Sequence, residues 1–131
     1  MTTIRTFMTD DHRRCDDFFA EAEQAIGKKN IEAARAAFGH FRTAVLAHFD
    51  SEEKTLFPTF EAKTGMTMGP TQVMRMEHQQ MRDLLSQAQA AAGDAGCRFF
   101  EAVEGIGAAV QGALTPASIA DATGVLFVED D

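Results

Sequence analysis

The amino-acid sequence predicts an all-α protein, an antiparallel up-down-up-down four-helix bundle with an irregular C-terminal tail. Along four segments, apolar residues recur at alternating spacings of three and four residues, the pattern of helices that bury one face. Gly or Pro separates these segments, and the 131 residues include neither Trp nor Tyr, which argues against an all-β fold. The length and the 45% hydrophobic residues indicate one domain with a sizeable core.

The first predicted helix starts after Thr9, a candidate N-cap, with Asp10 and Asp11 in its first turn, and it ends at Gly27. The second starts after Asn30 and ends or kinks at Pro58, so that residues 59–69 are expected to form a loop. The buried face of the first helix is Met8, His12, Cys15, Phe19, Ala22 and Ile26, and that of the second is Ala34, Phe38, Phe41, Val45, His48 and Glu52.

The third predicted helix has Pro70 at its first position and ends at Gly93. A fourth is expected over about residues 95–113, although three glycines within it each weaken it by up to about 1 kcal/mol. The buried face of the third helix is Met74, His78, Met81, Leu85, Ala88 and Ala92, and that of the fourth is Phe99, Val103, Ile106, Val110 and Ala113.

These elements divide the chain into a helical bundle over residues 1–114 and a divergent tail over residues 115–131. The tail is expected to hold one short helix capped by Thr115, then a strand-like apolar run and an acidic end.

The formal charge of -8 argues against a nucleic-acid-binding surface or a site for anionic lipid, because both need clustered Lys and Arg. The sequence shows neither a signal peptide nor an apolar stretch long enough to span a bilayer. Cys15 and Cys97 are too few and too distant to form a disulfide framework. These features predict a cytoplasmic protein with reduced thiols.

Four polar residues on the predicted buried faces point to a metal site. His12 lies near the start of its helix, His48 and Glu52 near the end of theirs, and His78 in the early turns of the third. In an antiparallel bundle these places share one end. A buried Glu without a partner is costly, whereas coordination keeps it ionised, and imidazole with carboxylate suits Fe, Mn or Zn. We therefore predict His12, His48, Glu52 and His78 as metal ligands.

The other polar and sulfur-containing residues have simpler interpretations. His40, just off the buried face, is expected to be a hydrogen-bonded core residue, and Glu53 and Glu77 are expected to face solvent. Cys15, one turn beyond His12, has a thiolate ligand or redox-sensitive neighbour as its alternative role. The expected core residues beside the site are Phe38, Phe41, Met74 and Met81.

Three segments resemble the hemerythrin HHE family in its bacterial single-domain form: MTDDHRRCDDFF around His12, LAHFDSEEKTLFPTFEAKTGM around His48 and Glu52, and VMRMEHQQMRDLL around His78. The second is the most specific. The resemblance implies a four-helix bundle with a carboxylate-bridged non-haem di-iron centre that binds O2 or related small molecules, or senses oxygen or iron. It further implies that His12 and His48 are ligands of one iron, Glu52 is the bridge and His78 is a ligand of the second iron.

The sequence departs from the family in the fourth helix, where another His and an acidic residue are expected. At a rise of about 1.5 Å per residue, this level falls at Val110 to Leu114, which supply no such side chain. Met74 also stands where some members have an additional His. A mononuclear or partial iron site follows, unless Asp121, Glu129 or Asp130 of the tail or a second chain in a homo-oligomer completes it.

The function predicted from these residues is non-enzymatic iron binding, with Mn or Zn as alternatives, for O2 or redox sensing, iron sensing, storage or delivery. A metal-free helical interaction domain that has lost its di-iron site is the rival interpretation. A third is an iron-dependent oxidase or nitric-oxide-consuming enzyme.

Overall fold

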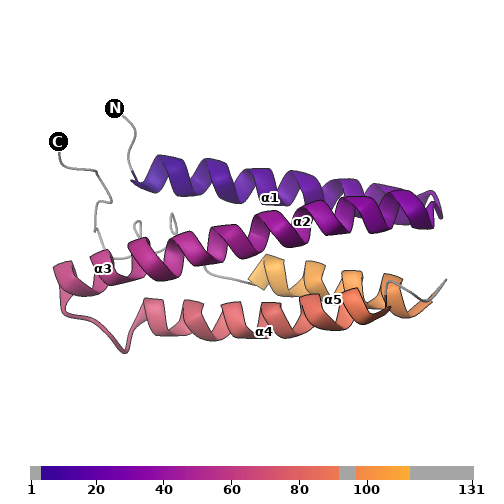
Figure 1. The fold of residues 1–131 in the computed structure, drawn as a ribbon. Coiled ribbons are helices and arrows are strands. Elements are labelled where there is room, and N and C mark those ends of the chain that lie inside the picture. The colour runs from indigo at the N-terminus through magenta and orange to yellow at the C-terminus, as the bar shows by residue number, and fades with distance from the viewer. Residues whose placement is uncertain (1–3, 92–96, 113–131) are drawn as a thin grey trace.

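The structure is a computed structural model of the chain, and it describes residues 4–91 and 97–112. These residues form an all-helical bundle with no strand. The first two long helices are α1 (Ile4–Gly27) and α2 (Ile31–Ser51). A π-helical turn, η1 (Glu52–Leu56), joins α2 to α3 (Phe57–Thr64), and α4 (Pro70–Ala91) and α5 (Cys97–Gly112) complete the bundle. Figure 1 shows consecutive long helices running in opposite directions, which confirms the predicted all-α antiparallel bundle.

Several predicted helix ends are confirmed. The Asn30 side chain caps α2 by accepting a hydrogen bond from the Ala33 N–H at 3.2 Å, and α4 begins at Pro70. α1 ends at Gly27, as predicted. Gly65, which was expected inside a loop, ends α3 in the left-handed conformation, with φ of 69°, which glycine adopts without strain. Residues 113–131, which include the predicted tail helix and strand-like run, lie outside the described residues, as do the predicted ends at residues 93, 95 and 113.

Two predicted boundaries are wrong. Thr9 is not an N-cap, because α1 already runs from Ile4. Met8 is 3% exposed and packs with Leu56, Phe57 and Met74. This tertiary burial outweighs the capping preference of Thr9, so the helix begins earlier.

Pro58 does not end the helical path either. The Phe57 N–H reaches back five residues to the Glu52 carbonyl, and Pro58 then occupies the first turn of α3. A proline clashes with the carbonyl four residues before it in a regular helix, and a π-turn changes that geometry locally. Residues 59–64 are therefore helical rather than part of a loop.

The core forms two apolar clusters with a polar layer between them. Along α1, His12 lies between Met8 of one cluster and Cys15 of the other. Along α4, His78 lies between Met74 and Met81 in the same way. On α2 and η1, the polar residues His48 and Glu52 separate Val45 from Leu56, so three helical segments bring polar side chains to one level. Within the described part of the chain, no helix is long and apolar enough to cross a membrane.

Candidate metal centre

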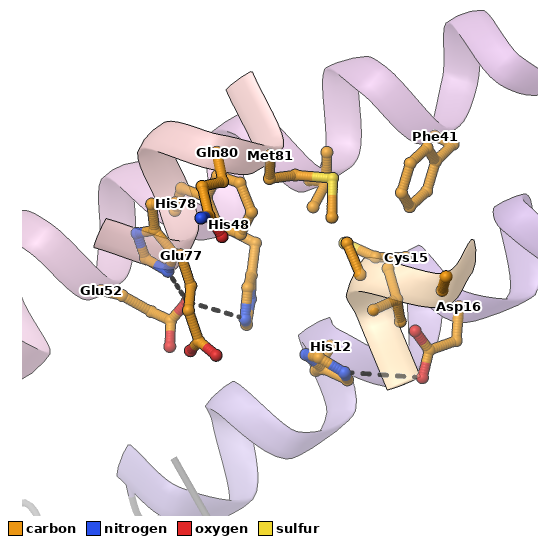
Figure 2. A pocket seen from close by; sticks show the side chains of 15 residues that line it. His12, Cys15, Asp16, Phe41, His48, Glu52, Glu77, His78, Gln80 and Met81 are labelled. Carbon is orange, nitrogen blue, oxygen red and sulfur yellow. Dashed lines mark ion pairs between the residues drawn. The ribbon is translucent and has the colours of Figure 1, made fainter. Parts of the chain in front are cut away.

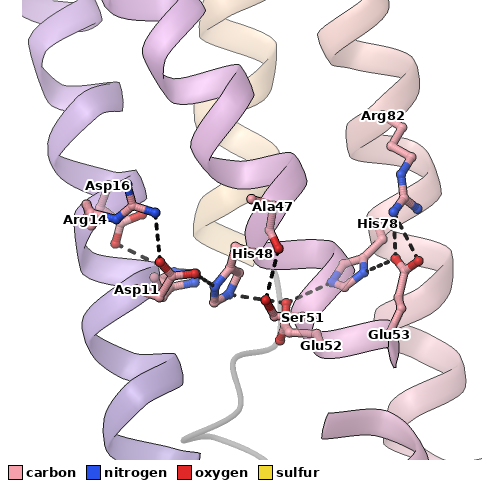
Figure 3. Close-up of polar contacts among 11 residues, drawn as sticks. Asp11, Arg14, Asp16, Ala47, His48, Ser51, Glu52, Glu53, His78 and Arg82 are labelled. Carbon is pink, nitrogen blue, oxygen red and sulfur yellow. Dashed lines mark hydrogen bonds and ion pairs between the residues drawn. The ribbon is translucent and has the colours of Figure 1, made fainter. Parts of the chain in front are cut away.

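The centre of the polar layer is the carboxylate of Glu52, which η1 directs into the bundle. Its side chain is 2% exposed. The Nε2 atoms of His48 and His78 lie 3.3 Å and 3.2 Å from its Oε1 atom. Figure 3 shows the carboxylate between the two imidazoles, one from α2 and one from α4. The structure therefore brings three of the four predicted site residues into direct contact.

His12 belongs to the same cavity but does not reach Glu52. Its ring meets that of His48 edge-on, with the centroids 5.4 Å apart, and its Nε2 lies 3.6 Å from Asp16 Oδ2. The His12 side chain is 31% exposed, whereas that of His48 is 2% exposed. Within residues 4–91 and 97–112, no three or more His, Cys, Asp or Glu side chains are already arranged as a metal-binding group.

Each of the two buried histidines is oriented by a carboxylate on its other ring nitrogen. His48 Nδ1 lies 2.8 Å from Asp11 Oδ2, and His78 Nδ1 lies 2.6 Å from Glu53 Oε2. An ionised carboxylate only accepts hydrogen bonds, so both Nδ1 atoms donate. Metal-bound histidines commonly have such carboxylate partners, which fix the tautomer and the ring orientation.

Arginines in turn hold both carboxylates. Arg14 donates to Asp11 Oδ1 at 2.9 Å, and one Arg82 nitrogen donates to both oxygens of Glu53 at 3.0 and 2.9 Å. Burial raises the pKa of the Asp11 carboxyl, but hydrogen bonds from Arg14 and His48 outweigh this effect and leave the pKa below its ordinary value. On each side of Glu52, a histidine, a carboxylate and an arginine thus lie in a row of polar contacts (Figure 3).

Aromatic rings also hold His78 in place. The Phe49 ring stacks on the imidazole at 3.9 Å between centroids with an interplanar angle of 18°, and the Phe57 ring stacks at 5.4 Å and 28°. The guanidinium groups of Arg82 and Arg75 lie over Phe49 and Phe57, at 5.7 and 5.0 Å from the ring centroids. Stacking fixes the imidazole plane, so its Nε2 is directed at Glu52.

The chemistry of these donors fits a cation. If Nδ1 carries the proton in each neutral ring, Nε2 presents a lone pair to a negatively charged oxygen, which is unfavourable unless a cation or a second proton lies between them. His48 Nε2 and Glu52 Oε2 are buried atoms without a hydrogen-bond partner. Ligands about 2.1 Å from one ion are roughly 3.0–3.4 Å apart, which matches the two Nε2–Oε1 distances.

A cavity of about 270 Å³ adjoins this centre, and Figure 2 shows the side chains that line it. His12, His48, Glu52 and His78 all contribute to its wall. The described part of α5 contributes only Ala108, Ala109 and Val110. Val110, where the site was predicted to meet the fourth helix, therefore does line the cavity. The α5 residues described there supply no ligand atom.

Sequence reasoning misplaced several neighbouring side chains. His40 is exposed rather than in the core. Glu53 does not face solvent, because it bonds His78 and Arg82, and half-buried Glu77 lines the cavity. The role of Asp11 was missed, since its position before His12 suggested only a helix-start charge. No local signal identifies these partners, which come from different helices.

Cys15 and the apolar residues beside the site are buried. Cys15 is a free, buried thiol, and burial raises its pKa to about 12, which disfavours the thiolate form that binds metals. The predicted core residues are confirmed as buried: Phe38, Phe41, Met74 and Met81.

Comparison with known families gives one result. A family model described as hemerythrin HHE cation binding domain matches residues 3–112, which is most of the chain. Neither a curated protein nor a solved structure is similar enough to match.

Proposed function

The chain belongs to the hemerythrin HHE cation-binding family, and from this premise we propose that it is a non-enzymatic iron-binding domain whose site is built on His48, Glu52 and His78. His12 stands beside them on the wall of the same cavity. The observation that carries this proposal is the convergence of two buried imidazole nitrogens on the buried Glu52 carboxylate, with His48 Nε2 and Glu52 Oε2 left without hydrogen-bond partners.

The surrounding residues support a site that is prepared for its ion. Asp11 and Glu53 hold the Nδ1 atoms of the two histidines, so the Nε2 atoms are available on the inside. Bound iron would supply a redox-active centre at these ligands. The chain's own contribution is to orient the imidazoles and to surround the centre with apolar side chains.

The function that suits this arrangement is reversible binding of O2 or another small diatomic molecule, for sensing, storage or delivery of oxygen or iron. The apolar wall of Ala108, Ala109 and Val110 leaves room beside the centre. In the described part of the chain, nothing on that wall occupies a further coordination position. We infer a mononuclear or otherwise incomplete centre when this chain acts alone.

Metal analysis of aerobically purified protein tests this proposal, with its visible and near-ultraviolet spectrum before and after oxygen removal. At least one iron per chain and a spectrum that changes reversibly with O2 are expected. Glu52→Gln should lower the iron content more than tenfold, because it removes the one carboxylate that contacts both histidines among the residues the structure describes. His40→Gln is the matched control, since His40 is exposed on α2. Background levels of Fe, Mn and Zn in the unaltered protein would contradict the proposal.

The rival is a metal-free helical interaction domain, and one observation favours it: Glu52 lies within ion-pair distance of His48 and His78, at 3.3 and 3.2 Å, and such contacts need no metal. In that case, added Fe(II) would leave the unfolding midpoint of the protein unchanged. A ligand that binds only the folded state raises the midpoint. Thermal unfolding with and without Fe(II) under anaerobic conditions separates the two functions.

A further inference from the structure

Exposed methionines gather where α3 turns into α4. Among the described residues, five large apolar side chains are exposed, and four of these lie within residues 66–76: Met66 at 43%, Met68 at 78%, Val73 at 45% and Met76 at 63%. Exposed apolar side chains that gather on one part of a surface mark a binding site. Three of the four carry a thioether sulfur, so the chemistry of this surface is that of sulfur as well as of apolar contact.

The turn between the two helices holds Met66 against the start of α4. Gly65 has a φ of 69°, and the Met66 N–H donates a hydrogen bond to Thr64 Oγ1 at 3.1 Å. The Met66 side chain then lies over Gly69, because a Cβ atom on Gly69 would be only 2.9 Å from Met66 Cε. The absence of a side chain at Gly69 therefore leaves the room that the end of the Met66 side chain occupies.

Helical spacing puts Met76 on the same face as this turn. The Val73 N–H donates to the Gly69 carbonyl at 3.3 Å, so Gly69 belongs to the first turn of the helix. Gly69, Val73 and Met76 follow at spacings of four and three residues and share one face. Long side chains on a helix lean toward its N-terminus, so the Met76 sulfur is directed toward the turn that carries Met66 and Met68.

This surface is separate from the Glu52 centre. Met76 comes two residues before His78, and at about 100° per residue the two side chains leave α4 on nearly opposite sides. His78 is accordingly buried, whereas Met76 is exposed. The cation beside Met76 in the sequence, Arg75, is paired with Glu61 at 3.1 Å. Its positive charge is therefore balanced and does not oppose a metal ion near Met76.

We propose that Met66, Met68 and Met76 form a binding site for Cu(I). Thioether sulfur is a soft ligand that selects Cu(I), whereas imidazole and carboxylate suit iron, manganese and zinc. Methionine side chains are flexible, which lets three sulfurs from a turn and a helix converge on one ion. The thioethers are uncharged, so the ion keeps its positive charge, and the formal charge of -8 on the protein favours its binding.

Anaerobic competition with the chromogenic Cu(I) chelator bicinchoninate tests this inference. The unaltered protein should hold one Cu(I) more per chain than the triple variant Met66→Leu, Met68→Leu and Met76→Leu, because leucine keeps the apolar character and removes the sulfur. Each single replacement should weaken this binding at least about tenfold, since even losing a residue that only orients a metal ligand costs that much. Val73→Leu is the matched control and should retain the ion, because it changes an exposed side chain of the same face without removing a sulfur.

Two further measurements locate the ion. Gly69→Ala keeps all three sulfurs but places a Cβ atom 2.9 Å from Met66 Cε, so it should displace that side chain and weaken Cu(I) binding several-fold. Nuclear magnetic resonance of protein labelled at the methionine methyl groups should show that Cu(I) shifts the signals of Met66, Met68 and Met76. The signals of the buried methionines should stay in place.

The outcomes distinguish this inference from the proposed function. Equal Cu(I) binding by the unaltered protein and the triple variant, or no binding by either, would overturn the methionine site and leave the iron proposal standing. Shifts confined to the buried methionines would overturn it as well. The triple variant should keep the iron content of the unaltered protein, and a loss of iron would show that these methionines do not form a separate site. Circular dichroism checks that each variant retains its helices.

Discussion

The His48–Glu52 pair and the His12–Asp16 pair have the same spacing and line one cavity, yet their environments differ. Both side chains of the first pair are 2% exposed, whereas those of the second are 31% and 50% exposed. The first pair has an outer carboxylate on the far ring nitrogen and a second histidine across the bundle. The same four-residue spacing therefore places a His beside a carboxylate in both pairs, and burial by other helices decides how firmly the two side chains are held.

The difference has a structural origin in the two helices. The continuous helical path of α2, η1 and α3 contributes α2 residues to one apolar cluster and η1 and α3 residues to the other. Core residues therefore lie on either side of the His48–Glu52 pair. The wider turn of a π-helix rotates less per residue than an α-helix, which helps the consecutive residues Glu52 and Glu53 both to reach α4. Asp16 on α1 stays at the cavity wall, where half of its side chain meets solvent.

The largest expected effect comes from removing a ring that holds His78. Phe57→Ala should lower the free energy of unfolding by about 3–5 kcal/mol, because Phe57 is fully buried and stacks on His78. The loosened His78 should also let iron leave the proposed centre faster. Urea denaturation and the rate of iron loss to a chelator measure the two effects. Phe18→Ala, at a half-buried position near His40, is the control and should leave the rate of iron loss unchanged.

Replacing the buried pair by apolar residues tests whether its polarity serves metal binding. The double variant His48→Leu and Glu52→Met should be more stable than the unaltered protein without metal by about 1–4 kcal/mol, since buried polar groups are costly. With iron at 100 times its dissociation constant, the unaltered protein should gain about 2.7 kcal/mol and the variant nothing. Denaturant unfolding with and without Fe(II) measures both values. A double variant that is less stable without metal would show that the pair stabilises the fold by itself.

The outer arginines give a smaller and unequal effect. Arg82→Met should weaken iron binding about 10- to 100-fold, because Arg82 holds both oxygens of Glu53 and thereby orients His78. Arg14→Met should have less effect, since the Arg14 side chain is 55% exposed and makes one hydrogen bond to Asp11. Competition with a chromogenic chelator gives both affinities. Equal losses would mean that burial of the outer residues does not matter.

The smallest expected effect is a loss of stability at high pH, caused by burial of the Cys15 thiol at the α1 wall of the cavity. The pKa of Cys15 is about 12 in the folded protein and is ordinarily 9.0, so the unfolded chain ionises first as the pH rises. Stability is complete below pH 9 and is lost progressively above it, by about 1 kcal/mol between pH 8 and pH 10. Urea unfolding of Cys97→Ser, with and without an added Cys15→Ala substitution, isolates this slope. Parallel pH profiles would show that solvent reaches the thiol.

Helix periodicity predicted much of the fold because burial follows the repeat of the α-helix. The predicted faces of α2 and α4 are buried from Ala34 to Glu52 and from Met74 to Ala88. Local signals failed where tertiary packing opposed them, at Thr9 and Pro58. The predicted level of the site was recovered because antiparallel topology and helix rise relate sequence position to height in the bundle.

The sequence by itself determined the four long helices, most of their buried faces and the candidate set His12, His48, Glu52 and His78, because these follow from spacing along one chain. Only the tertiary structure decided that Asp11 and Glu53 hold the histidines, that Phe49 and Phe57 enclose His78, and that His12 pairs with Asp16. These contacts depend on the rotation of each helix about its axis and on side-chain rotamers. A difference of one residue's rotation turns a solvent-facing carboxylate into a partner of a buried imidazole.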